Sequence, residues 1–192
     1  MPCDTNTHCQ DERVSQHHKA SGHGPVKDDE YVIFVVFDSN VQIGKKLSER
    51  DFSTKKIAKG DLSLARKAYT TINDAQECVI QPALDRGQKV SGASVALTRS
   101  LRSIKAPIEG LTPVKYARGV CILDRVENDD HEGHAALRSC RDEGALTPKQ
   151  RGKLRALIAA DLAEKFDVLQ AIADVFTLSA ANIPSIVATP GR

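Results

Sequence analysis

The sequence contains no tryptophan, and aromatic residues make up only 4% of its 192 residues. A buried core must therefore consist mainly of aliphatic side chains. Neither sign of charge dominates, because 27 Lys and Arg residues nearly balance 25 Asp and Glu residues. Such a balance creates no strong overall field that would attract nucleic acid. The longest apolar run, residues 31–37, is far shorter than the roughly 20 residues of a membrane-spanning helix, so we expect no membrane partner.

The cysteines are few, odd in number and irregularly spaced: Cys3, Cys9, Cys78, Cys121 and Cys140. A disulfide framework in a small secreted protein usually has an even number of cysteines. The sequence therefore predicts free thiols, which persist in reducing compartments. We accordingly expect a cytoplasmic protein.

Three regions are predicted from the distribution of apolar residues. Residues 1–30 contain almost no aliphatic side chains. They cannot bury enough surface to offset the entropy cost of ordering, so we expect a flexible N-terminal tail. Residues 31–177 hold the periodic apolar patterns and are predicted to form a single domain. Residues 178–192 are predicted to be a loose C-terminal tail.

Two apolar segments predict strands, and a third predicts a long helix. Residues 31–37 are all β-branched or aromatic, which is typical of a strand buried on both faces. Residues 116–126 form the second segment and are expected to lie near the centre of the sheet. The pair Thr147-Pro148 is a favourable helix start. Apolar residues then recur at three- and four-residue spacing as far as Phe176, and a break near Asp167 is left open.

These elements predict an α+β fold, in which a small mixed or antiparallel sheet packs against a long C-terminal amphipathic helix. Residues 62–69 are predicted to form a helix capped by Asp61. Residues 41–47 could form another strand. The segment 92–104 fits both a strand and a helix, and the run Ser94-Val95-Ala96-Leu97-Thr98 favours the strand.

The densest cluster of chemically versatile side chains is Asp129-Asp130-His131-Glu132-Gly133-His134. Carboxylates and imidazoles bind divalent metals, so Asp129, Asp130, His131 and His134 are the candidate metal ligands. The candidate catalytic groups are His131, His134 and Glu132, for instance as a general base. The run from His131 to His134 is one residue short of the zinc motif H-E-x-x-H.

The same cluster also has a structural interpretation, which we favour. Either aspartate would cap a short helix, residues 132–139, by accepting hydrogen bonds from its first N–H groups. His134 would then pack inward with Ala135 and Leu137.

Basic side chains gather before and at the start of the C-terminal helix, and they are candidate nucleic-acid contacts: Arg138, Arg141, Lys149, Arg151, Lys153 and Arg155. Such residues bind phosphate oxygens. No aromatic residues are interleaved with them, and the same pattern is typical of the solvated face of an amphipathic helix. Both interpretations stay open.

A resemblance to small uncharacterised bacterial accessory proteins is carried by three segments: Gly92-Ala93-Ser94-Val95, Tyr116-Ala117-Arg118-Gly119-Val120, and residues 129–137, which end in His134-Ala135-Ala136-Leu137. Those proteins carry a strand, an acidic or Asn-containing turn, and a His-Ala pair that enters a short helix. The resemblance spans residues 60–165. It implies a context near mobile-element or defence modules and implies no reaction.

Two functional hypotheses follow. The first is a non-enzymatic accessory or interaction protein, whose protein partner contacts residues 128–134 and the start of the C-terminal helix. The second is a metal-dependent hydrolase or nuclease, whose divalent metal is held by residues 129–134. Motifs of nucleotide-binding enzymes and of α/β-hydrolases do not occur in the sequence, so those classes receive no support.

Overall fold

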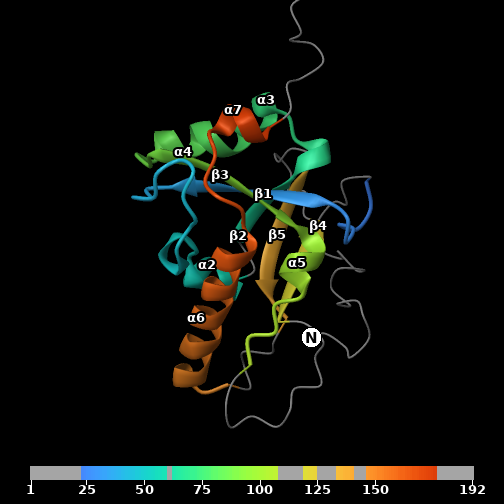
Figure 1. The fold of residues 1–192 in the computed structure, drawn as a ribbon, viewed down its shortest axis with the longest axis vertical. Coiled ribbons are helices and arrows are strands. Elements are labelled where there is room, and N and C mark those ends of the chain that lie inside the picture. The colour runs from blue at the N-terminus through green and yellow to red at the C-terminus, as the bar shows by residue number, and fades with distance from the viewer. Residues whose placement is uncertain (1–22, 60–61, 108–118, 125–132, 141–145, 177–192) are drawn as a thin grey trace, which may run out of the picture.

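The computed structural model describes residues 23–59, 62–107, 119–124, 133–140 and 146–176. These residues form an antiparallel sheet of five strands in the order β3-β1-β2-β5-β4 (Figure 1). The strands are β1 (Tyr31–Phe37), β2 (Leu62–Arg66), β3 (Val90–Leu97), β4 (Val120–Asp124) and β5 (His134–Ser139). The helical segments are η1 (Glu49–Asp51), α2 (Thr54–Lys59), η2 (Lys67–Tyr69), α3 (Ile72–Ala75), η3 (Gln76–Ile80), α4 (Gln81–Asp85), α5 (Thr98–Arg102), α6 (Pro148–Lys165) and α7 (Ile172–Val175). The predicted α+β class is thereby confirmed.

The middle of β1 is buried on both faces. All five residues from Val32 to Val36 are buried, and their side chains alternate between two apolar cores. Figure 1 shows α3, α4 and α7 together on one side of β1 and β3, while α2 and α6 lie on the other side. The prediction of a strand covered on both faces is therefore confirmed.

The start of α6 follows the sequence signal. The Thr147 hydroxyl accepts a hydrogen bond from Gln150 N–H, and the Gln150 side chain accepts one from Thr147 N–H at 2.9 Å. This reciprocal capping box satisfies two backbone donors that the helix itself leaves unpaired. Pro148 occupies the first turn, where its missing N–H costs nothing.

One stripe of α6 forms the floor of the larger core. Leu154, Ile158 and Leu162 recur every four residues, and all three are fully buried. The helix ends at Lys165, so the break near Asp167 that the sequence leaves open is present. α6 thus presents a single apolar face to the sheet and leaves its other faces to polar residues.

Beyond α6 the chain becomes extended and joins the free edge of β3. Asp167 N–H donates to the Val95 carbonyl, and Gln170 and Ala93 exchange two backbone hydrogen bonds of 2.8 and 3.0 Å. The apolar spacing therefore does not continue as one helix to Phe176. The physical reason is that Phe176 belongs to the core on the opposite side of the sheet from α6.

The predicted helix at residues 62–69 is wrong. Leu62 and Leu64 enter the core under α6, whereas Ala65 faces the other core. This alternation is the signature of a strand, β2, which the short turn η2 then follows. Leucine and alanine spacing over so few residues fits both periods, so the pattern alone could not separate them.

Three further predictions change in detail. Residues 41–47 form an irregular segment with one isolated bridge, between Lys46 and Val168, instead of a strand. The segment 92–104 takes both conformations in turn, because β3 ends at Leu97 and α5 follows directly. β4 lies at the edge of the described sheet and not at its centre.

The predicted N-terminal tail extends too far. Val26 is buried, and its carbonyl accepts a hydrogen bond of 2.7 Å from the Arg102 guanidinium. The same guanidinium pairs with Asp28 at 2.6 Å. Residues 23–30 therefore pack against the folded unit, and a tail ending at residue 30 is wrong for these eight residues; residues 1–22 lie outside the described part.

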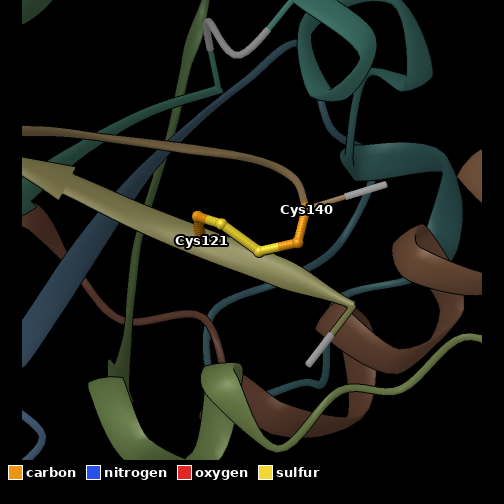
Figure 2. The surroundings of a disulfide bond; sticks show 2 residues. All are labelled: Cys121 and Cys140. Atoms are coloured by element: carbon orange, nitrogen blue, oxygen red, sulfur yellow. A yellow bond between two sulfur atoms is a disulfide. The ribbon is translucent and has the colours of Figure 1, made fainter. Parts of the chain in front are cut away.

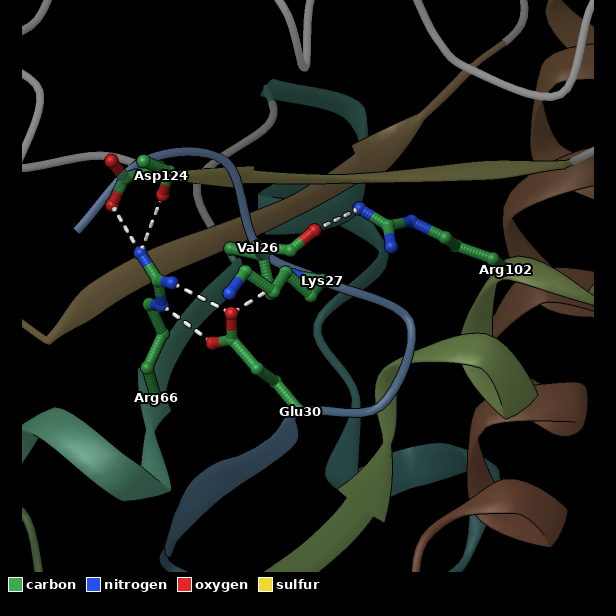
Figure 3. A network of polar contacts seen from close by, with 7 residues as sticks. Val26, Lys27, Glu30, Arg66, Arg102 and Asp124 are labelled. Atoms are coloured by element: carbon green, nitrogen blue, oxygen red, sulfur yellow. Dashed lines mark hydrogen bonds and ion pairs between the residues drawn. The ribbon is translucent and has the colours of Figure 1, made fainter.

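A buried arginine ties the segment before β1 to two strands (Figure 3). Arg66 of β2 has a fully buried side chain, and Glu30 accepts two hydrogen bonds of 2.8 Å from it. Asp124 of β4 pairs with it at 3.2 Å. Burial alone lowers the pKa of the Arg66 guanidinium, but both carboxylates outweigh burial and raise that pKa. The guanidinium also lies 4.6 Å from the centre of the Tyr69 ring.

Cys121 and Cys140 form a disulfide (Figure 2). The first cysteine lies in β4, and the second follows β5, so the bond joins the ends of two paired strands. The prediction that these two cysteines are free thiols is therefore wrong. Irregular spacing could not reveal the pair, because it depends on which strands become neighbours in the sheet.

None of the helices in the described ranges has the length and apolar character needed to cross a lipid bilayer.

Leu162→Ala should lower the free energy of unfolding by about 2–5 kcal/mol, because it removes a fully buried side chain and leaves a cavity. Glu164→Ala on the same helix is the matched control, since Glu164 is exposed and should change stability by no more than about 0.5 kcal/mol. Chemical unfolding followed by circular dichroism measures both. Equal effects of the two substitutions would contradict the assigned face of α6.

Glu30→Gln should cost about 3–5 kcal/mol, because it removes one of the two carboxylates that pair with the buried Arg66 charge. The exposed Glu77 supplies the control, and Glu77→Gln should be nearly silent. Urea unfolding at neutral pH compares the two variants with the parent protein. A loss below about 1 kcal/mol for Glu30→Gln would show that the network contributes little.

Candidate functional site

The structure describes only part of the predicted metal and catalytic cluster. Asp129, Asp130, His131 and Glu132 lie outside the described residues, and so does Arg141. Within the described ranges, no group of three or more His, Cys, Asp or Glu side chains is arranged to hold a metal ion. The metal-site prediction therefore stays a prediction.

His134 is the member of the cluster that the structure places. It is the first residue of β5, not part of a short helix, so the predicted helix over residues 132–139 is wrong from residue 134 onward. Ala135 and Leu137 enter the core under α6, and strand alternation turns His134 to the opposite face. The expectation that it packs together with those two residues is therefore also wrong.

The imidazole of His134 is paired across the sheet. Its Nε2 lies 2.9 Å from Oγ of Ser63 in the neighbouring strand β2. His134 stands opposite Ala65, two residues from Ser63, so the contact is a diagonal pair on one face of the sheet. The adjoining Gly133 has no room for a side chain, because a Cβ atom there would lie 2.1 Å from Oγ1 of Thr70. This close approach fixes where the chain enters β5.

The candidate nucleic-acid residues that the structure describes lie on two sides of the sheet. Arg138 alternates with Leu137 in β5, and Leu137 faces α6, so Arg138 lies on the face turned away from that helix. The other described candidates all lie on α6, where Lys149 and Lys153 are exposed and Arg151 and Arg155 are half-buried. The sheet thus separates Arg138 from the basic residues of the helix.

The sheet opens between β1 and β2. β1 pairs with β3 over its whole length, and β2 pairs with β5 at four positions. Within the described ranges, β1 and β2 pair with each other only at Val32–Arg66 and Ile33–Ala65. The pairing stops because the strands run in different directions. In Figure 1, β1 runs across the view, whereas β2 and β5 run down it. We call the wedge that opens beyond Ile33 the β1–β2 cleft.

The cleft encloses a cavity of about 310 Å³. Besides the two strands, Asp51, Ser53 and Lys56 line it on the side of η1 and α2. Val79 and Gln88 line it on the side of η3. The cavity therefore has apolar strand residues at its base and charged residues at one wall.

Hydrogen bonds at both ends of β1 show which way its backbone groups point. The Glu30 carbonyl accepts from Thr98 N–H at 2.9 Å. Past the other end, Asp38 N–H donates to the Lys89 carbonyl at 2.8 Å. The backbone N–H and C=O groups of the even-numbered residues of β1 thus point toward β3. Backbone groups alternate in direction along a strand, so the N–H and C=O of Val35 point into the cleft.

The backbone of β2 supplies the other side. Arg66 N–H donates to the Gly133 carbonyl at 2.7 Å, toward β5. Because backbone groups alternate in direction, the N–H and C=O groups of Ala65 and Ser63 point toward β1. Ala65 meets Ile33, but Ser63 and Val35 do not pair, because the strands have separated. Among the described residues, Val35 and Ser63 form no ladder pair across the cleft.

The sequence does not predict this cleft, although the residues of β2 carry a pattern typical of a strand. A polar Ser63 between Leu62 and Leu64 is the alternation of a half-buried strand. This alternation places Ser63 on the face of the strand opposite the two leucines. Nothing in the local sequence shows where two strands stop pairing, since that depends on the neighbours each strand acquires.

Comparison of the chain with protein-family models, with curated proteins and with solved structures finds no match.

Ser63→Ala and His134→Ala should each cost about 0.5–1.5 kcal/mol if their hydrogen bond is a structural cross-strand contact. The double substitution should then cost less than the sum of the two single substitutions, because one shared interaction is lost in both. Urea unfolding of the four proteins measures this coupling. Strictly additive effects would show that the pair contributes nothing to stability.

Proposed function

We propose that the protein is a non-enzymatic interaction protein and that its partner polypeptide binds in the β1–β2 cleft. The observation that carries this proposal is the pair of strand edges at Val35 and Ser63, whose backbone groups face the cleft and, among the described residues, form no ladder pair with each other. Unpaired strand edges are ready-made templates for another chain. Proteins that leave such an edge accessible use it to recognise extended peptides.

The size of the cleft favours a short polypeptide segment over a large cofactor. Its volume of about 310 Å³ lies at the lower end of the roughly 300–1,000 Å³ typical of small-molecule sites. The wall on the side of α2 carries opposite charges, on Asp51 and Lys56. Backbone amides of a peptide complement the strand edges, which a purely apolar ligand could not do.

The wider biological role rests on the sequence resemblance alone. An accessory protein of bacterial type, linked to mobile-element or defence modules, remains our proposal for that role. A protein partner at residues 128–134 also remains a prediction, because residues 128–132 lie outside the described part of the chain. Identifying the genes that flank the coding sequence would test the predicted context.

The alternative, a metal-dependent hydrolase or nuclease, has less support. His134 is the described member of that cluster, and its Nε2 faces Ser63. Metal content after purification without a nickel column tests the alternative. Stoichiometric metal that disappears when His131 and His134 are both replaced by alanine would favour it over the interaction protein.

The predicted cytoplasmic location rests on free thiols, and the Cys121–Cys140 disulfide removes that argument for two of the five cysteines. Disulfides are uncommon in proteins of reducing compartments. We therefore propose that the protein works in an oxidising environment. Mass spectrometry after thiol alkylation of protein taken directly from its native source would show whether the two sulfurs are bonded there.

Lys56→Trp should block peptide binding, because Lys56 is an exposed residue of α2 whose side chain lines the cleft. The probe is a peptide selected on the parent protein from a phage-displayed random library, and its affinity is measured by fluorescence anisotropy. We expect a loss of about tenfold or more, equivalent to about 1.4 kcal/mol of binding free energy.

Lys55→Trp is the matched control. Lys55 is also exposed and adjacent in α2, but it lines another hollow, between α2 and α6. Its replacement should leave the affinity unchanged within about twofold. Failure of the library to yield a binder, or equal effects of the two tryptophans, would overturn the proposed function.

A further inference from the structure

We infer that the partner segment binds as an additional β-strand along β1, hydrogen-bonded to the backbone of Val35 and Phe37. This inference rests on the proposed function and specifies how the segment is held. Both residues are odd-numbered, so their N–H and C=O groups point away from β3 and into the cleft.

β1 is the better of the two edges because it is held rigidly. All seven of its residues are paired with β3, and its central residues are packed between two cores. A strand fixed in this way presents its outward donors and acceptors at a regular spacing. The bound segment then gains hydrogen bonds without any need to order β1 first.

The divergence of the strands restricts the segment to one of them. β1 and β2 run in steeply different directions (Figure 1). An added strand must lie nearly parallel to its neighbour, about 4.8 Å away. A segment aligned with β1 at Val35 therefore diverges from β2 and cannot pair with both edges along its length. Its hydrogen bonds to β1 consequently involve every second residue only.

The walls of the cleft define the side chains that the segment needs. Successive side chains of an added strand point to opposite sides of the sheet. On the side of α2 they meet Asp51, Ser53 and Lys56. On the side of η3 they meet Val79 and Gln88. A segment that alternates polar residues with small apolar residues fits this arrangement, with the apolar residues turned toward Val79.

The test is an N-methyl scan of the peptide selected on the parent protein. Each N-methyl group removes one backbone donor and leaves the side chain intact. We expect affinity to fall about tenfold or more at every second residue and to change little at the residues between. Loss at consecutive residues, or at none, would overturn the added strand.

Hydrogen exchange followed by NMR provides an independent readout on the protein. The amides of Val35 and Phe37 should exchange more slowly when the peptide is bound. Val36 is the control, because its amide faces β3 and should be protected with and without peptide. Unchanged exchange at Val35 with bound peptide would also overturn the inference.

The two proposals fail in different ways. If Lys56→Trp abolishes binding but the N-methyl scan shows no alternation, the cleft is the binding site and the segment is not a strand. If Lys56→Trp has no effect, the cleft is not the site, and both proposals are wrong.

Discussion

The guanidinium of Arg66 is the point on which the arrangement of the sheet depends. It is fully buried, and it is neutralised by Glu30, which precedes β1, and by Asp124 at the end of β4. Exchanging such a network for apolar residues often costs no stability, so its contribution is best sought in geometry. Arg66 stands opposite Val32, at one of the two positions where β1 and β2 still pair. The ion network therefore closes one end of the wedge whose other end is the β1–β2 cleft.

From that closed end, the course of each strand follows from its other neighbour. β1 stays paired with β3 and β2 stays paired with β5, and these two pairs of strands run in different directions (Figure 1). Two apolar cores then fill the two sides of the sheet. The opening at Val35 thus follows from the different directions of the two pairs of strands.

Elements defined by long or uniform local patterns could be predicted from the sequence. The continuous β-branched run of β1 and the capped start of α6 at Thr147 belong to this kind, because their signals are independent of tertiary neighbours. The conformation of short segments could not be predicted in this way. Residues 62–66 and 134–139 have patterns that suit a helix and a strand equally, and strand pairing decided between them. The cleft could not be predicted, because it depends on where β1 and β2 stop pairing. The disulfide could not be predicted either, because it depends on β4 and β5 being neighbours in the sheet.

The Cys121–Cys140 bond also changes what a break in the chain would do. The bond closes a ring that contains most of β4, all of β5 and the segment between them, with a sequence separation of 19 residues. A protease that cuts one peptide bond inside this ring leaves both products covalently joined. The nicked chain therefore runs as a single species on a non-reducing gel, and only reduction releases its two fragments. Damage confined to this part of the molecule is consequently retained within it rather than shed.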